Sequence, residues 1–330
     1  MSLQVESLDI EKRSQDIGNE SRDIEDEIQE LERKLAAAKA RLGDRAISSP
    51  SFEDKGPITI NNGENILISL DEKLSDRPLV LSPQSNHFLL LLSDSALPLG
   101  SFAFSSGLES YLAHTKPRSS FPDFLAFSLS SYASTTLPFV LAAHRNPRDL
   151  VDLDDAQDAS IMCTVGRRAS IAQGRALLSI WDRSFSAALS TGLTTSTSVD
   201  GVDTLKEFSM LLKSISSAPK TTSGEIPPVS AHLAPLFGAI TSTVGMSLEQ
   251  TAYVFMLSHV KALLSAAVRA SMFGPYHAQK VLASEEVQIG IKEAIEREWN
   301  TKVEDAGQSV PVMDLWIGRH EMLYSRIFNS

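Results

Sequence analysis

The feature that most constrains this chain is the helical spacing of its apolar residues from residue 86 to residue 330. In the stretch 154–183 they recur every three or four positions, at Ile161, Val165, Ala169, Ala172, Ala176 and Ile180. This is the period of one face of a helix. Strand-type alternation of apolar and polar residues is nearly absent from the same region. The sequence therefore predicts an all-α fold, a bundle of roughly eight to ten helices.

Proline, glycine and capping residues divide this pattern into separate helices. Ser247 and Gln250 have the spacing of a capping box, which marks a helix start. Ser119 or Ser120, before Phe121-Pro122, fits a second helix start, with proline tolerated in the first turn. Pro138 lies inside a long apolar stretch and should kink or divide its helix. The helices expected from these signals cover residues 87–95, 101–114, 119–143, 154–183, 247–272, 277–299 and 311–328.

Residues 1–45 form a separate segment with a partial heptad pattern. One seam consists of Ile10, Ile17, Ile24, Leu31 and Ala38, and a second seam consists of Ile28, Leu35 and Leu42. Only about two and a half heptads carry both seams, short of the three to four that identify a coiled coil. Three interpretations stay open: a solvated and partly frayed helix, a self-pairing coiled coil, and a helix that pairs with a partner.

Segments rich in proline, glycine, serine or threonine border the helical region. We interpret residues 46–85 as a linker, with a brief strand expected at 58–60 or 66–70. Two low-complexity stretches, near 190–199 and 216–228, are expected to be surface insertions. The chain is thus divided into an extension, a linker and a helical domain over residues 86–330.

Composition and charge exclude several classes of protein. The chain has 30 Lys and Arg against 41 Asp and Glu, a net charge of −11 that disfavours nucleic acid. One cysteine cannot form an internal disulfide, and the acidic N-terminus has no apolar run typical of a signal peptide. The most apolar stretch, 251–273, contains His259, Lys261 and Arg269, which favours a core helix over a membrane span. We expect a cytoplasmic protein that binds neither nucleic acid nor a membrane.

No catalytic motif is found in the sequence. The phosphate-binding loop, the G-x-S-x-G turn and the H-E-x-x-H helix are all absent. Cys163 has no neighbouring histidine and is more simply a buried structural thiol than a nucleophile. The acidic run from Asp149 to Asp158 is interpreted as a solvated loop with acids at a helix N-terminus, and a transient cation site is the alternative. We therefore predict no catalytic residue, no permanent metal site and no tightly bound cofactor.

Three segments carry a more specific pattern. The first runs Ser93-Asp94-Ser95-Ala96-Leu97-Pro98-Leu99-Gly100-Ser101-Phe102 and continues to Ser105-Ser106-Gly107-Leu108-Glu109. Pro98 and Gly100 should reverse the chain. Gly107 would let another helix approach closely, although a helical glycine costs about 1 kcal/mol relative to alanine.

The second segment runs from Arg168 through Ser170 and Gly174 to Leu178, and its small residues suit tight helix packing. The third comprises Ala231-His232-Leu233-Ala234-Pro235, then Gln279, and the terminal string His320-Glu321-Met322-Leu323-Tyr324-Ser325-Arg326-Ile327-Phe328-Asn329-Ser330.

Together the three segments resemble the UreF family of urease accessory proteins, from about residue 86 to residue 330. The sequence departs from the family pattern at Phe102, where many members have tyrosine, and at Phe104, where histidine is frequent. The extension has no counterpart in the family.

The resemblance implies an all-helical, commonly dimeric adaptor that is not an enzyme. Such proteins bind UreD (also called UreH), and the pair recruits the nickel-carrying GTPase UreG to apo-urease. Nickel would be handled only in transit. Two rival interpretations stay open: an enzyme of unknown type, and a helical scaffold unrelated to urease that binds through residues 1–45.

The resemblance also assigns roles to residues of this chain. Arg326 is the strongest single candidate, because a guanidinium can bridge several oxygens at once. The alternative is that Arg326 only complements a helix dipole. The implied partner-binding residues are Phe102, Glu109, Tyr324, Ser325, Arg326 and Phe328. The implied structural residues are Asp94, Pro98, Gly100, Ser105, Gly107, Leu108, Gly174, His232 and Gln279.

Overall fold

The computed structural model describes residues 83–115, 119–190, 196–217 and 227–329. All of them belong to one compact unit, Asp76–Ser330. The predictions for 1–45 and for most of the linker lie outside the described residues. So do 191–195 and 218–226, the centres of the two expected insertions, while Ser196 already belongs to a helix.

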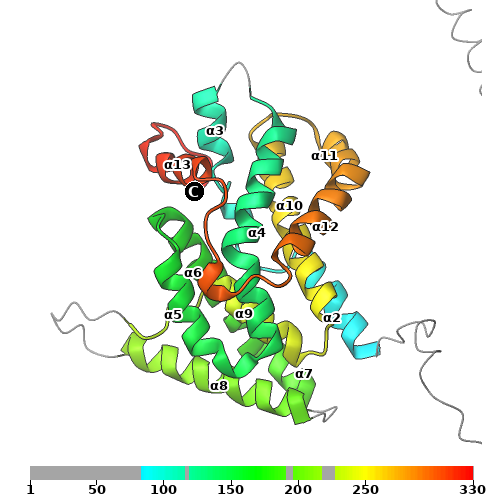
Figure 1. The fold of residues 1–330 in the computed structure, drawn as a ribbon, viewed down its shortest axis with the longest axis vertical. Coiled ribbons are helices and arrows are strands. Elements are labelled where there is room, and N and C mark those ends of the chain that lie inside the picture. The colour runs from blue at the N-terminus through cyan, green and yellow to red at the C-terminus, as the bar shows by residue number, and fades with distance from the viewer. Residues whose placement is uncertain (1–82, 116–118, 191–195, 218–226, 330) are drawn as a thin grey trace, which may run out of the picture. The chain divides into compact units, whose positions relative to one another are not determined.

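Every regular element of the described residues is a helix, so the all-α prediction is confirmed (Figure 1). The α-helices are α2 (Pro83–Ser93), α3 (Leu108–Thr115), α4 (Phe121–Arg145), α5 (Leu150–Ser160), α6 (Thr164–Ile180), α7 (Ser186–Ser190), α8 (Ser196–Ser217), α9 (Leu233–Thr243), α10 (Leu248–Arg269), α11 (Pro275–Leu282), α12 (Glu285–Glu298) and α13 (Val312–Arg319). Short helical turns are η1 (Ser101–Ala103), η2 (Pro147–Asp149), the π-helical η3 (Trp181–Phe185), η4 (Val303–Asp305) and η5 (His320–Met322).

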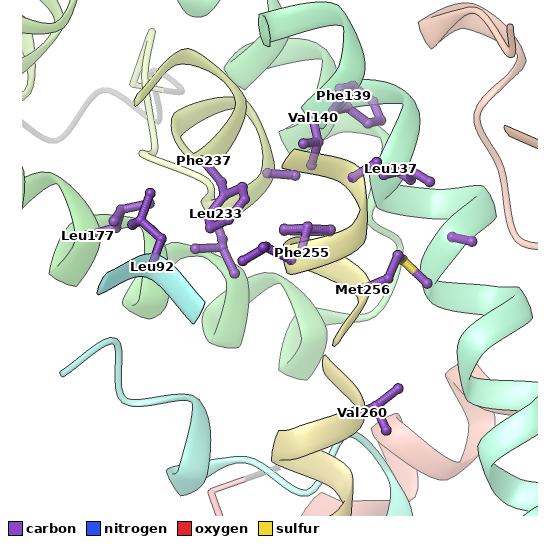
Figure 2. Close-up of a cluster of buried hydrophobic side chains, with 14 of the residues drawn as sticks. Leu92, Leu137, Phe139, Val140, Leu177, Leu233, Phe237, Phe255, Met256 and Val260 are labelled. Atoms are coloured by element: carbon purple, nitrogen blue, oxygen red, sulfur yellow. The ribbon is translucent and has the colours of Figure 1, made fainter. Parts of the chain in front are cut away.

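Helix α9 lies at the centre of the bundle. Every residue from Leu233 to Thr241 is buried, because α4, α5, α6, α8 and α10 all pack against it. A helix that is apolar on all sides can only be stable inside such a core. Figure 2 shows the resulting cluster, in which Phe237 of α9 lies among apolar side chains of α4 and α10.

The contact between α9 and α4 depends on Gly238. A side chain at this position would overlap the carbonyl oxygen of Val140 and would lie 3.0 Å from Ala143 Cβ. The backbones therefore approach more closely than any other residue at position 238 would permit. This close approach seats α9 against α4, its most extensive helix contact.

Two predicted helix starts are confirmed. Ser120 caps α4 by accepting a hydrogen bond from the Asp123 amide, at 3.4 Å. Ser247 and Gln250 form the reciprocal capping box at the start of α10, at 3.1 and 2.9 Å. Pro138 does not divide α4, which continues through it to Arg145.

Three predicted helices are wrong in extent. The stretch 154–183 contains the end of α5, a break after Ser160, and α6, because Ile161 and Cys163 take extended conformations. The stretch 277–299 is divided into α11 and α12 by Ser284, which caps the second helix. The last helix ends at Arg319, and only the short turn η5 follows it.

The stretch 101–114 is also divided. Its first residues form η1, Phe104 is extended, and α3 begins only at Leu108. Ser106 and Gly107 have positive φ values of 50° and 88°, which interrupt a helix. Gly107 therefore precedes α3. The sequence-based prediction that it lies inside a helix is wrong.

Helices α4 and α10 are long and apolar enough to cross a membrane by length and composition alone. In each, however, 67% of the apolar window is buried inside the described fold. Such burial is typical of core helices, as the charged residues of 251–273 predicted for α10.

Replacing Gly238 by alanine should destabilise the protein by about 1–3 kcal/mol, because the added methyl meets a backbone carbonyl that cannot rotate away. Gly290 of α12 is the matched control, since a side chain there meets only Leu129 Cδ1 at 3.7 Å. Gly290→Ala should stabilise by roughly 0.5–1 kcal/mol through helix propensity. Urea unfolding of both variants measures the difference, and equal effects would contradict the close approach.

Candidate functional site

The first and third sequence segments meet in the folded chain, although more than 200 residues separate them. Tail residues 320–329 pack against 101–109, and we call this contact the tail junction. The Glu109 carboxylate is at its centre, in the first turn of α3. It accepts hydrogen bonds from His320 Nε2 (2.9 Å), the Ile327 amide (2.7 Å) and the Phe328 amide (3.3 Å). One carboxylate thus holds three donors of the tail, and bonds to a charged group are stronger than neutral ones.

His320 depends on this carboxylate. Its side chain is fully buried, and its Nδ1 atom has no hydrogen-bond partner among the described residues. The Glu109 side chain is only 12% exposed. Because a buried polar ring needs at least one partner, Glu109 is what permits the burial of His320.

Gly107 makes room for α13 at the same junction. A side chain at Gly107 would lie 3.1 Å from Ile317 Cγ1 and 3.3 Å from Trp316 Cβ. The ring of Trp316 in turn meets the Tyr111 ring edge-on, with centroids 4.8 Å apart. The predicted close approach of another helix to Gly107 is therefore confirmed, and the partner is α13.

The end of the tail is anchored by an aromatic ring. Phe328 is 4% exposed, and the Arg269 guanidinium of α10 lies 4.5 Å from its ring centroid. This is a cation–π contact. The Asn329 amide adds a hydrogen bond to the Ala103 carbonyl at 2.8 Å. Both contacts fix the tail along its last described residues.

The second sequence segment reaches the tail through an ion pair. Glu321 binds Arg168 of α6 and also Arg326, the latter at 3.0 Å. Hydrogen bonds from Arg168 and then Arg326 lower the pKa of Glu321. These side chains are 41–63% exposed, so the pairs add little stability. They do bring Arg326 to a defined place beside α6.

The six implied partner-binding residues divide into two groups. Glu109 and Phe328 face their own chain, and Phe102 is half-buried. Tyr324, Ser325 and Arg326 are exposed, and Tyr324 is fully so. Leu315 of α13 is also exposed, at 60%, as are Met322 and Ile327 of the tail, at 80% and 63%. The junction thus presents an outward surface of mixed apolar and cationic character, which we call the tail surface (Leu315, Met322, Tyr324, Arg326, Ile327).

The implied structural residues near the chain reversal have local roles. Gly100 has φ 73°, as the predicted turn requires. The exposed Asp94 accepts a hydrogen bond from the Ala96 amide at 2.9 Å, and Pro98 is exposed. Leu108 is buried.

Ser105 and Gln279 differ in their surroundings. Ser105 is buried, and its hydroxyl accepts a hydrogen bond from the Glu109 amide at 3.4 Å. Gln279 is exposed on α11, where it lines a cavity of about 420 Å³ together with Phe102, Lys261 and Arg269.

His232 lies at a second junction, which ties α5 and α6 to the loop before α9. The Asp154 carboxylate accepts hydrogen bonds from the Ser230, Ala231 and His232 amides at 2.6, 3.0 and 2.6 Å. These bonds hold Ala231 at a φ of 70°, a strained value for alanine. A side chain at Gly174 would lie 2.6 Å from the His232 carbonyl carbon, so only glycine fits there.

The His232 imidazole connects two further residues. Its Nε2 lies 2.7 Å from Asp158 Oδ1, and its Nδ1 lies 3.0 Å from Ser170 Oγ. Arg167 also binds Asp158 through Nε at 2.7 Å. Asp158, His232 and Ser170 are the three residue types of a serine hydrolase triad. Here, however, Asp158 is shared with Arg167, and Ser170 Oγ also accepts a hydrogen bond from the Leu233 amide. We interpret the group as a structural link between helices.

Sequence reasoning missed the roles of Asp154, Asp158 and Arg167. The acidic pattern predicts a solvated run, but Asp154 is fully buried. Asp158 binds the Arg167 guanidinium and the His232 imidazole. The available signal was the four-residue spacing of Asp154 and Asp158, which places both on one face of α5.

Cys163 lies just before α6 as its N-cap residue and is half-buried. The sequence predicted a buried thiol, so this prediction is wrong. In the part of the chain that the structure describes, no three histidine, cysteine, aspartate or glutamate side chains gather into a group that could hold a metal ion.

Comparison with known proteins gives the family. The sequence model of the UreF family matches residues 116–285, just over half of the chain. A UreF-like urease accessory protein of Schizosaccharomyces pombe is 37% identical over 251 residues, covering 76% of this chain and 99% of the relative. The chain belongs to the UreF family.

Relatives with lower identity also have names of urease accessory proteins. Urease accessory protein 6 of Cryptococcus neoformans is 27% identical, covering 76% of this chain and 98% of its own length. Urease accessory protein F of Oryza sativa is 29% identical over 78% of this chain and 92% of its own length. The relatives are named as accessory proteins, and their match extends over most of their length.

Glu109→Ala should release the tail of this UreF protein. The variant removes an acceptor of three bonds and leaves His320 unpaired, at a cost on the order of 3 kcal/mol in tail docking. Amide hydrogen exchange at Ile327 and Phe328 should therefore quicken by roughly a hundredfold. Glu321→Ala, which removes only exposed pairs, is the control and should change exchange little. Unchanged protection in Glu109→Ala would contradict the central role of this carboxylate.

Asp158 should make the stability of the protein depend on pH. Burial raises its pKa, but the hydrogen bonds and charges of Arg167 and His232 outweigh this and lower it overall. The stabilisation is therefore present above the ordinary aspartate pKa and is lost as pH falls through the lowered value in the folded state.

Asp158→Asn should reduce the free energy of unfolding at pH 7 by roughly 1–3 kcal/mol. The deficit should shrink below about pH 4. Urea unfolding between about pH 2 and pH 7 measures the deficit. The exposed Asp155→Asn is the control and should stay near the parent. A deficit that is constant with pH would refute the assignment.

Proposed function

We propose that this UreF protein is an adaptor in the assembly of the urease nickel centre. It would bind UreD and, with it, recruit the GTPase UreG to apo-urease. Family membership and the names of its relatives support a role as a urease accessory protein. The observation that carries the adaptor role is the tail junction, which fixes the tail while leaving the tail surface exposed.

The tail surface has the chemistry of a protein interface. Aromatic residues, methionine and arginine are enriched in interfaces, and here Tyr324, Met322 and Arg326 are displayed on one short segment. Glu321 holds Arg326 in place by accepting a hydrogen bond from Arg326 Nη1, at 3.0 Å. The other donors of the guanidinium remain for a carboxylate or carbonyl of a partner.

Nickel is the cargo in this proposal and not a cofactor. Ions released by UreG would pass through the assembly to urease, and no tight site in this protein would retain them. The protein would act in the cytoplasm, as a homodimer, and without catalysing a reaction itself. The alternative function, a helical scaffold unrelated to urease, has no support from the relatives.

A complementation experiment tests the proposal. In a host that lacks its own UreF, this chain should restore urease activity without changing the amount of urease protein. Arg326→Ala should abolish most of that activity and reduce UreG co-purification at least about tenfold, because a charged interfacial contact is lost. UreD should still co-purify.

Two variants serve as controls. Arg319→Ala removes an exposed arginine of α13 outside the tail surface and should behave as the parent does. Arg326→Lys should rescue only in part, because an ammonium cannot reproduce the fork geometry. Full UreG recruitment by Arg326→Ala, or equal loss with Arg319→Ala, would refute the role of Arg326. Failure of the parent chain to restore activity would refute the function.

A further inference from the structure

A cavity of about 320 Å³ lies among α4, α6, α10 and the start of α13. Its volume falls within the usual range of small-molecule sites. Its lining includes Ser128 and Tyr132 of α4, Phe255 and His259 of α10, and Asp314 of α13. Neither the proposed contact with UreG nor the tail surface accounts for this cavity.

One wall of the cavity is a stack of three rings. Tyr132 lies flat against Phe255, with centroids 5.1 Å apart and an interplanar angle of 13°. It also lies flat against His259, at 3.9 Å and 7°. Phe255 and His259 are one turn apart on α10, and both of their rings line the cavity together with Tyr132. The part of the Tyr132 ring that remains for the cavity is suited to stacking on another planar group.

The hydroxyl of Tyr132 is available to a ligand. It has no hydrogen-bond partner among the described residues, whereas Ser128 Oγ is engaged by His259 Nε2 at 2.9 Å. Burial raises the pKa of the Tyr132 phenol, so the group stays protonated and can donate. A polar ligand in the cavity would therefore gain a hydrogen bond that the protein itself does not satisfy.

The charge of the cavity comes from a single side chain. Among its described lining residues, Asp314 is the only aspartate, glutamate, lysine or arginine, and no described residue forms an ion pair or hydrogen bond with its carboxylate. Burial lowers the pKa of His259 to about 3, so the imidazole is neutral at physiological pH. An unpaired carboxylate in a cavity whose imidazole is neutral attracts a cation and repels an anion.

We propose that this cavity binds a small planar organic molecule with one positive charge, such as an amidine or a guanidine. The planar group would stack on Tyr132, and the charged group would pair with Asp314. The stack favours planarity, the free hydroxyl favours a polar ligand, and the lone carboxylate selects the sign of the charge.

Three probes of nearly equal shape test the sign of the charge: benzamidine, benzamide and benzoate. Titration of the full chain, followed by methyl NMR of Ile161, Met313 and Ala169, locates binding at the cavity lining. Benzamidine should bind at least about fivefold more tightly than benzamide, and benzoate should bind more weakly than both.

Asp314→Asn should abolish the preference for benzamidine over benzamide while benzamide still binds. Asp305→Asn removes an acid of η4 that does not line the cavity, and it should retain the preference. Tyr132→Leu should weaken both probes, provided that its circular dichroism matches that of the parent. Benzoate binding as tightly as benzamidine, a preference that survives Asp314→Asn, or unshifted lining methyl groups at millimolar benzamidine would each overturn the proposal.

Discussion

The burial of α9 from Leu233 to Thr241 is the constraint on which the rest of the structure depends. A helix that is buried on every side must be surrounded, and α4, α5, α6, α8 and α10 surround it. Glycine is required where α9 and α4 touch, at Gly238, and where the loop before α9 crosses α6, at Gly174. The polar loop that leads into α9 is satisfied by the buried Asp154. Each device solves a problem that the burial of α9 creates.

The tail junction is built on that frame by a different kind of interaction. The bundle core is held by apolar burial, which is not directional. The tail is held by the Glu109 carboxylate, whose three hydrogen bonds define both position and orientation. Directional bonds suit the proposed role of the tail, in which a few side chains, Arg326 among them, would be presented in a fixed arrangement to a partner.

The sequence was sufficient for the fold class and for several helix starts, because these depend on local patterns. Ser120 and the Ser247–Gln250 pair act within one helical turn, and both were predicted. The divisions at Ser284 and after Ser160 were missed, since apolar spacing continues across them. The break before α3 was missed for another reason, that serine seldom adopts the positive φ of Ser106.

The candidate site was predictable in its membership but not in its geometry. The resemblance named Glu109, Arg326 and Phe328, yet nothing local in the sequence shows that Glu109 binds the tail across 218 residues. The partners of His232 were hidden for the same reason, because Asp158 and Ser170 lie 74 and 62 residues away. Contacts of this kind exist only once the bundle has formed.

That separation along the chain has a consequence for how the protein matures. The bond between Glu109 and His320 closes a loop of 211 residues, and the entropy of closing it must be met before the bond can form. Contacts at such long range assemble late in folding. A chain that has not completed its bundle therefore lacks an ordered tail, so display of Arg326 at its fixed place reports that folding is finished. Any partner that reads this tail would select finished molecules over immature ones.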